Sequence, residues 1–121
     1  LAKTAGADRD RLARDLGVAK FHLVQIASAA NIVEFLLERN AMYDAAESAE
    51  KARRLDRMEA ICRDEIENAS AALPLVDADA RLGWHGEAYG YMINRPLIEA
   101  KIAGLRVILE ERIPAERAKL G

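Results

Sequence analysis

Apolar residues recur at helical spacing through two long segments, and this pattern constrains the fold more than any other feature. Within residues 48–73 the apolar positions lie three or four residues apart and share one helix face: Leu55, Met58, Cys62, Ile66, Ala69 and Leu73. Residues 18–43 are apolar most of the way round, which predicts a central, buried helix. Period-two alternation is not sustained anywhere, so the sequence predicts an all-α bundle of three main long helices.

Whether the first segment forms one helix or two depends on Gly17. The charged segment Asp8–Asp15 is predicted to form an N-terminal turn or a short helix, with Thr4 and Asp8 as candidate caps. A glycine inside a helix costs up to about 1 kcal/mol relative to alanine. The first helix is therefore expected either to be continuous or to be split at Gly17.

Prolines set the other predicted boundaries. The second helix is expected to run from Ala46 or Ser48 to Leu73, because Pro74 disfavours helical geometry at the residue before it. The third is expected to start near Pro96, with Asn94 as its cap, and to be limited by Pro114. Its buried stripe is predicted at Leu97/Ile98, Ile102, Leu105 and Ile108/Leu109.

Composition indicates one domain with an aliphatic core. The chain has 121 residues, 51% of them hydrophobic but only 5% aromatic. Because 18 basic residues are balanced by 20 acidic ones, a nucleic-acid partner is not expected. The most apolar run, residues 18–37, is interrupted by Lys20, His22, Gln25, Asn31 and Glu34, so we expect neither a membrane-spanning segment nor a membrane partner. Since the chain begins with Leu1, we expect residues 1–121 to be one helical domain of a longer protein.

A long aromatic and glycine-rich segment, Leu75–Asn94, separates the second and third helices and is the expected functional site. It holds the only Trp, Trp84, together with Tyr89, Tyr91, His85 and three of the seven glycines. The aromatic rings suit stacking on a sugar or packing at a protein interface. The alternative, in which they plug the end of the bundle, remains open.

Metal and catalytic sites are not expected in this segment. An EF-hand counted from Asp77 would need an oxygen ligand where Arg81 stands and glycine where Leu82 stands. We expect instead that Asp77 or Asp79 pairs with Arg81 or caps a turn. His85 and Glu87 are compatible with an acid/base pair, but we favour polar groups that satisfy one another. The sequence indicates no cofactor.

Three features of the helices themselves bear on function. Asn31 lies on an apolar stripe and is expected to hydrogen-bond across to the loop or to a partner domain, because an unpaired buried amide is costly. Cys62 is predicted to be a small core residue. The charged segment Glu50–Glu67 is predicted to be a solvated helix face.

The run Leu73–Met92 resembles the C-terminal helical region of large bacterial glycoside-hydrolase-like proteins. The similarity lies in Asp79–Ala80–Arg81–Leu82–Gly83–Trp84, followed by Glu87, Ala88, Tyr89 and Tyr91, and in Ser28–Phe35 on the preceding long helix. Ala80 stands where these proteins often have serine. In that family a hexosaminidase- or α-glucuronidase-like catalytic barrel precedes the helices. The resemblance implies a helical domain that packs on the barrel and contributes Arg81, Trp84, His85 or Tyr89 to its sugar-binding cleft.

Three functions follow as hypotheses. The first is an accessory domain of a carbohydrate-active enzyme, not catalytic by itself, with the upstream catalytic domain and a carbohydrate as partners and an exposed apolar patch at Trp84 and Tyr89. The second is a structural or oligomerisation module that forms a homodimer through a self-complementary face. The third is a small-molecule-binding bundle with the loop as its lid.

Overall fold

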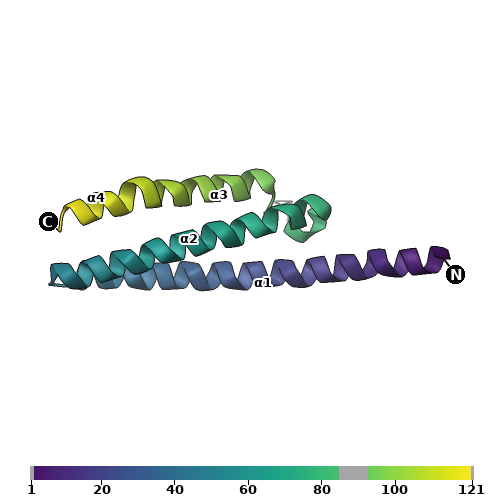
Figure 1. Cartoon of the computed structure of the whole chain (residues 1–121), viewed down its shortest axis with the longest axis horizontal. Coiled ribbons are helices and arrows are strands. Elements are labelled where there is room, and N and C mark those ends of the chain that lie inside the picture. Colours follow the sequence, from purple (N-terminus) through teal and green to yellow (C-terminus); the bar gives the residue numbers. More distant parts are fainter. Residues whose placement is uncertain (1, 85–92, 121) are drawn as a thin grey trace.

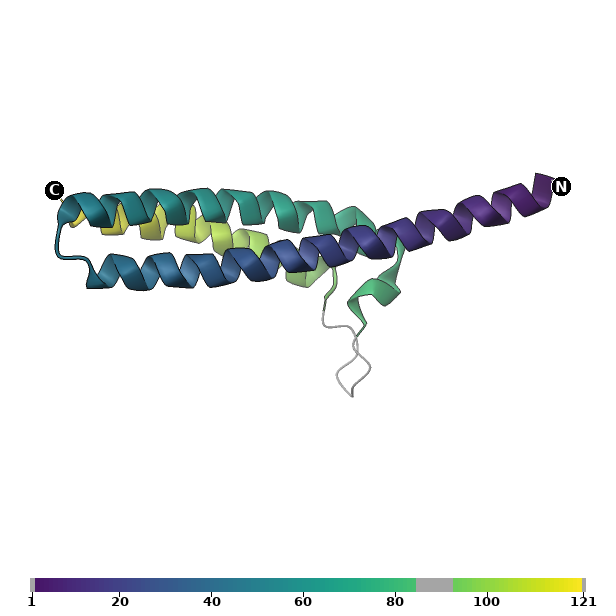
Figure 2. The same ribbon diagram turned by 90° about the horizontal axis from the view of Figure 1, so that it is seen from below.

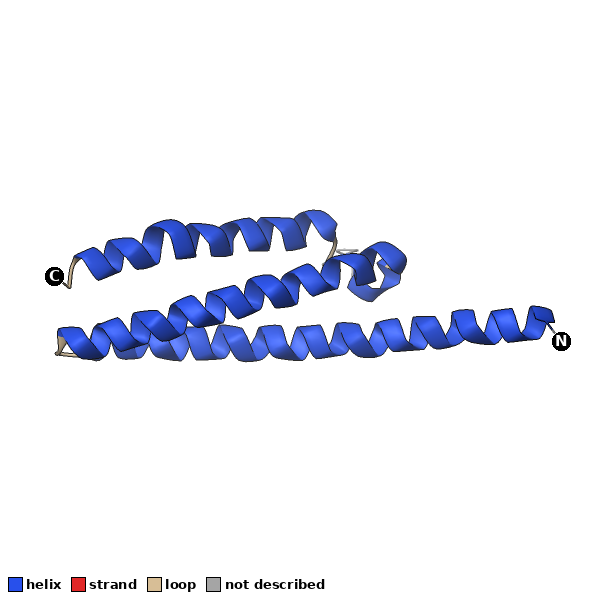
Figure 3. Cartoon of the chain, viewed as in Figure 1, coloured by secondary structure: helices blue, strands red, loops and turns tan. Residues whose placement is uncertain are grey.

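The structure, a computed structural model, describes residues 2–84 and 93–120. All the regular structure in these residues is helical (Figure 3), which confirms the prediction of an all-α bundle. The elements in chain order are α1 (Ala2–Asp44), α2 (Ser48–Ala78), the 3₁₀ helix η1 (Ala80–Gly83), α3 (Arg95–Val107), the π-helical turn η2 (Ile108–Arg112) and α4 (Ile113–Ala118).

The helix α2 lies in the middle of the bundle (Figure 1). It packs antiparallel to α1 on one side and to the rod α3–η2–α4 on the other, whereas α1 and α3 do not pack along their lengths. The N-terminal part of α1 extends beyond the end of the bundle (Figures 1 and 2). The prediction that the first helix is the central, buried one is therefore wrong. Its apolar circumference is only partly covered, because α2 occupies the centre.

The first helix is continuous through Gly17, so the split does not occur. The charged segment Asp8–Asp15 belongs to the same helix, which begins at Ala2, and Thr4 and Asp8 are consequently not at its start. Good helix formers surround Gly17, and its cost of about 1 kcal/mol is too small to break a helix of this length.

The helix α2 passes through Pro74 and ends at Ala78, so the predicted end at Leu73 is wrong. Proline removes one backbone donor, and the ring here lies on the exposed side of the helix. On the other side Leu73, Leu75 and Val76 pack into the core cluster. Burial of these side chains offsets the lost hydrogen bond.

The third rod starts as predicted. The side chain of Asn94 accepts a hydrogen bond of 3.0 Å from the backbone N–H of Leu97, and Pro96 occupies the first turn of α3. Pro114 does not end the rod, contrary to the prediction. The wider turn η2 precedes it, and Pro114 then stands in the first turn of α4.

Two clusters form the core. One lies toward the α2–α3 corner and comprises Phe21, Ala69, Ala72, Val76, Ile98 and Ile102. The other lies toward the α1–α2 turn and comprises Met42, Leu55, Met58 and Ile113. Cys62 is 1% exposed, and burial raises the pKa of its thiol to about 11, so its predicted role as a core residue is confirmed. Leu97, predicted on the buried stripe, is 51% exposed.

Candidate functional site

The expected loop begins with a corner held by Asp79 and Arg81. Asp79 caps η1 by accepting a hydrogen bond of 3.1 Å from the backbone N–H of Arg81. Its two carboxylate oxygens each accept a bond of 2.8 Å from the Arg81 guanidinium, which holds the pKa of Asp79 at about 2. The predicted Asp–Arg pair is present, and it lies at the surface, because the Arg81 side chain is 74% exposed.

A tight backbone crossing follows this corner. The N–H of Ile93 donates to the carbonyl of Gly83 over 3.2 Å. A Cβ on Gly83 would lie 1.7 Å from the carbonyl oxygen of Ile93, so only glycine fits. Beside the crossing, Arg95 Nε donates to Asp77 Oδ1 over 3.0 Å. Asp77 is therefore tied to the start of α3 instead of to Arg81.

Trp84 is 58% exposed. It is not enclosed by the described helices, which disfavours the interpretation that it plugs the end of the bundle. The other expected contact residues, His85, Glu87, Tyr89 and Tyr91, lie outside the described residues. Of the expected loop site, the structure therefore brings together Asp79, Arg81 and Trp84.

Asn31 takes a different partner from the predicted one. Its side-chain amide donates to Asp64 Oδ2 over 3.0 Å and to Glu65 Oε2 over 2.7 Å, both on α2. The expectation of a bond to the loop or to another domain is therefore wrong. The amide is satisfied within the hairpin, because α2 passes directly beneath the apolar stripe on which Asn31 stands.

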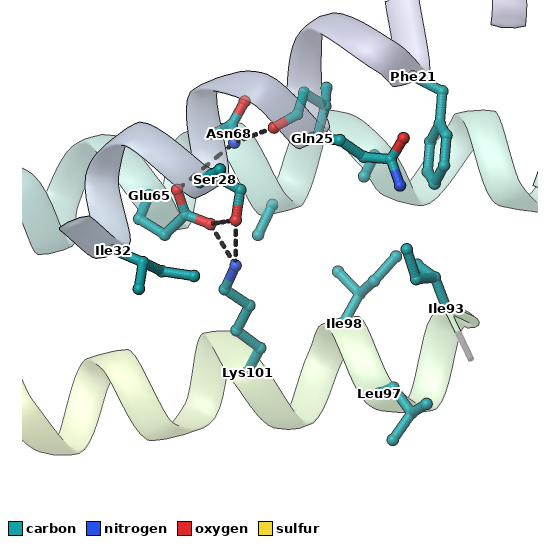
Figure 4. A pocket seen from close by; sticks show the side chains of 14 residues that line it. Phe21, Gln25, Ser28, Ile32, Glu65, Asn68, Ile93, Leu97, Ile98 and Lys101 are labelled. Atoms are coloured by element: carbon teal, nitrogen blue, oxygen red, sulfur yellow. Dashed lines mark hydrogen bonds and ion pairs between the residues drawn. The ribbon is translucent and has the colours of Figure 1, made fainter. Parts of the chain in front are cut away.

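A buried polar cluster surrounds Glu65, which is 3% exposed. Glu65 Oε1 accepts a hydrogen bond of 2.6 Å from Ser28 Oγ and forms an ion pair with Lys101 Nζ (Figure 4). Lys101 Nζ also donates to Ser28 Oγ over 2.6 Å. Asn68 donates to Glu65 over 3.4 Å and to the carbonyl of Val24 over 2.9 Å. The cluster thus connects α1, α2 and α3 at one point.

The electrostatics of Glu65 fit a structural role. Burial alone would raise its pKa, but the hydrogen bonds from Lys101, Ser28 and Asn31 outweigh burial and hold the pKa below its usual value. A carboxylate that stays ionised and fully hydrogen-bonded is a poor general base or nucleophile near neutral pH. Among the described residues, no buried side-chain nitrogen or oxygen lacks a partner.

Sequence reasoning missed Glu65, because it placed Glu50–Glu67 on a solvated face. Most of that face is indeed exposed and ion-paired; Arg54, for example, donates to Glu38 over 3.1 Å and to Glu50 over 2.7 Å. However, residue 65 follows Cys62 by three positions and precedes Ala69 by four, so it lies on the apolar stripe. That gap in the stripe was the available signal.

A hollow of about 390 Å³ lies beside this cluster, between α1 and α3 (Figure 4). Apolar side chains line most of it, among them Phe21, Val24, Ile32, Ile93, Leu97 and Ile98. Four of its five polar side chains, those of Glu65, Ser28, Lys101 and Asn68, already bond one another, and the fifth is the amide of Gln25. The hollow therefore offers apolar packing and little directed chemistry.

A row of small and aliphatic side chains runs along the uncovered side of α1. The residues alternate at spacings of four and three, as the a and d positions of a heptad repeat do. We call this row the α1 seam: Leu12, Leu16, Ala19, Leu23, Ile26, Ala30, Val33 and Leu37. Its six larger side chains are 52–69% exposed.

The side of α1 that packs inside the bundle occupies a different heptad position. Phe21, Ser28 and Phe35 are spaced by seven and stand at the f position, opposite the seam. The seam makes no part of the two core clusters. Most of it faces away from α2, and only Leu16 lines a hollow shared with the end of α2 and η1. Six of the thirteen large hydrophobic residues that are exposed in the described part of the chain lie on the seam, and uncovered apolar patches mark interaction sites.

By length and composition alone, α1 also contains a stretch able to cross a membrane, with few of its residues buried. This finding differs from the expectation that no segment is apolar enough. The same stretch is tied to α2 by polar bonds, including those of Asn31 and one of 2.6 Å from Arg57 Nε to Glu34. In the structure, these polar bonds make the stretch one arm of the α1–α2 helical hairpin.

Comparison with protein-family models, curated proteins and solved structures yields no match. Within residues 2–84 and 93–120, His, Cys, Asp and Glu side chains do not gather in groups of three or more that could hold a metal ion. The features left as candidates for function are the α1 seam and the exposed Trp84 beside Asp79 and Arg81.

Proposed function

We propose that the chain is a structural helical module that self-associates through the α1 seam. The observation that supports this proposal is an uncovered heptad row on a helix whose opposite side packs in the core. One helix thus carries two apolar faces, one for the bundle and one for a partner.

The extent of the seam fits helix pairing. From Leu12 to Leu37 it covers more than three heptads, which is the length over which a heptad pattern indicates a coiled coil. At 1.5 Å per residue it is about 38 Å long. The flanking positions hold mainly small and polar side chains, as in Ala13, Lys20, Ala27 and Glu34, with Leu36 as an exposed apolar exception. A row of this width suits one helix.

Sedimentation equilibrium over a wide range of protein concentrations tests the proposal. We expect the chain to have the mass of an oligomer, and the double variant Leu23→Glu/Ile26→Glu to be a helical monomer. Val107→Glu is the matched control, because Val107 is an exposed aliphatic residue on α3, 41% exposed and away from the seam. A monomeric wild-type chain at all concentrations, or equal association of the seam variant, would contradict the proposal.

A second candidate function is an interdomain or sugar contact at Trp84, as expected for an accessory domain of a carbohydrate-active enzyme. It is supported by the exposure of this ring beside the Asp79–Arg81 corner. An exposed ring with a charged pair beside it suits stacking on a sugar. A β/α barrel encoded next to this segment would favour the accessory-domain function.

Trp84 is the only tryptophan, so its fluorescence reports directly on contact. Titration with neutral sugars and sugar acids should shift its emission in a saturable way if the site binds carbohydrate. An unchanged emission across the panel would count against a sugar site.

A further inference from the structure

We propose that the partner of the α1 seam is the same helix of a second copy, running antiparallel about a two-fold axis between Val24 and Gln25. This inference rests on the proposed self-association and adds the orientation and the register. In this arrangement the seam of each copy covers that of the other along its full length.

The seam has a symmetric pattern about that point. Its alanines, Ala19 and Ala30, are equidistant from the centre, and every larger residue has a larger residue at the mirrored position. Antiparallel pairing therefore forms four kinds of layer, in which small meets small and large meets large: Leu12 with Leu37, Leu16 with Val33, Ala19 with Ala30, and Leu23 with Ile26. Every layer joins a d position to an a position.

A parallel dimer fits the same residues less well. Parallel dimers favour β-branched residues at a and leucine at d. Here the β-branched Ile26 and Val33 stand at d, whereas leucine occupies a at Leu16, Leu23 and Leu37. This reversed pattern disfavours two parallel strands. Antiparallel layers contain one residue of each kind and avoid the conflict.

The residues that end the seam also distinguish the orientations. The next heptad position outward is Arg9 at one end and Asn40 at the other, and the two are equidistant from the centre. A parallel pair would place Arg9 against Arg9 of the second copy, where like charges repel. An antiparallel pair places Arg9 opposite Asn40. The side-chain oxygen of Asn40 accepts a bond of 3.3 Å from Arg39 and has a second lone pair that can accept one from the Arg9 guanidinium.

The positions beside the seam permit close approach. In the antiparallel register two long polar side chains face alanines of the second copy: Lys20 faces Ala27 and His22 faces Ala29. Glu34, which already bonds Arg57 of its own α2, stands opposite Ala13. No like charges are opposed along the seam. The core residues of α1 stand at f, on the side opposite the second copy.

The arrangement also explains the N-terminal extension of α1. The N-terminal part of α1 extends beyond the bundle (Figure 2). Antiparallel pairing places residues 5–12 of one copy against residues 37–44 of the second copy, next to its α1–α2 turn. Each extension would thus gain from the other copy the support that its own bundle does not provide.

Single cysteines at the two alanines test the orientation. Ala19→Cys and Ala30→Cys are made separately, with the buried native Cys62 left in place, and are oxidised alone and as an equimolar mixture. The antiparallel register predicts disulfide dimers almost only in the mixture, as heterodimers. Both substitutions are at exposed small residues, and circular dichroism and sedimentation establish that helix content and dimer mass are retained.

The other outcomes separate the two levels of the proposal. Homodimeric disulfides of each variant alone, with the oligomer mass retained, would overturn the antiparallel register and leave self-association standing. A monomer without disulfides in any sample would overturn both. Flotation of the chain with phosphatidylcholine vesicles, lost in Leu23→Glu/Ile26→Glu, would show that the seam contacts lipid and would overturn the assignment to a second copy.

Discussion

Glu65 shows how a charged side chain becomes part of a core. It stands at a stripe position of α2, and donors reach it from α1 and α3. The free energy of such a group depends on these partners, because a buried charge without them is strongly destabilising. Removal of one partner should therefore cost more than removal of the whole pair.

We predict that Lys101→Met destabilises the bundle by about 2 kcal/mol, measured by urea unfolding. This value lies below the 3–5 kcal/mol typical of fully buried pairs, because the Lys101 side chain is 37% exposed. The double variant Glu65→Leu/Lys101→Met should be more stable than Lys101→Met, since Asn31 and Asn68 keep Asp64 and the Val24 carbonyl as acceptors. A double variant less stable than the single one would contradict this account.

Two glycines provide a matched pair at the same scale. Gly83→Ala should cost about 2–3 kcal/mol, because the new Cβ would collide with the Ile93 backbone and force the crossing apart. Gly104→Ala should instead stabilise the chain by about 0.5–1 kcal/mol, because a Cβ there meets nothing within 4 Å and alanine favours the helix. Thermal unfolding of the two variants measures both effects. Equal effects of the two substitutions would show that the crossing is not the constraint.

At the scale of the elements, the helices and the starts of α2 and α3 were predictable from the sequence, whereas the boundaries placed at prolines were not. The spacing of residues 48–73 and the cap at Asn94 predicted α2 and the start of α3 correctly. The helix ends predicted at Pro74 and Pro114 were wrong, because a proline indicates only a local free-energy cost to the helix. Whether the helix continues depends on what the neighbouring residues bury, and Val76, after Pro74, and Ile113, directly before Pro114, are both buried.

We predict that Pro74→Ala raises the free energy of unfolding by about 1 kcal/mol, because alanine restores a helix donor at an exposed position. The gain is smaller than the full cost of a helix proline, since proline also restricts the unfolded chain. Urea unfolding measures the change. A loss of stability would mean that the ring itself packs usefully.

The first helix illustrates a second limit of sequence reasoning. Apolar residues on most sides of this helix were interpreted as a sign that it is buried. The same pattern arises when one face packs in the core and a second face remains uncovered. The heptad order of the seam was present in the sequence, but its meaning depends on which face α2 covers. The expected loop site was placed only in part, at Asp79, Arg81 and Trp84.

At the scale of the whole molecule, we expect the free energy of unfolding of the bundle to fall at acid pH. The pKa values of Glu50, Glu59, Glu65, Asp77 and Asp79 are all lowered in the folded chain, chiefly by arginine or lysine partners. A carboxylate of this kind stabilises the fold above its unfolded pKa, near 4.5 for Glu and 3.8 for Asp. That stability is lost as the pH falls through the lower folded value.

We therefore predict that the free energy of unfolding declines below about pH 4.5, measured by urea unfolding across the acid range. Glu65 should contribute most, because it is the buried member of the group. The variant Glu65→Gln should have a flatter pH profile and lower stability at neutral pH. An unchanged profile in this variant would assign the acid sensitivity to the surface pairs.

The central position of α2 also sets an order of assembly in time. Only three residues, 45–47, join α1 to α2, so this hairpin can start to form at its turn, where Met42 and Leu55 of one core cluster are close in sequence. Local contacts favour fast folding. The third rod joins α2 through a longer segment and does not pack along α1. Folding should therefore proceed by rapid closure of the α1–α2 hairpin, followed by slower docking of α3, with Lys101 reaching Glu65 in the second step.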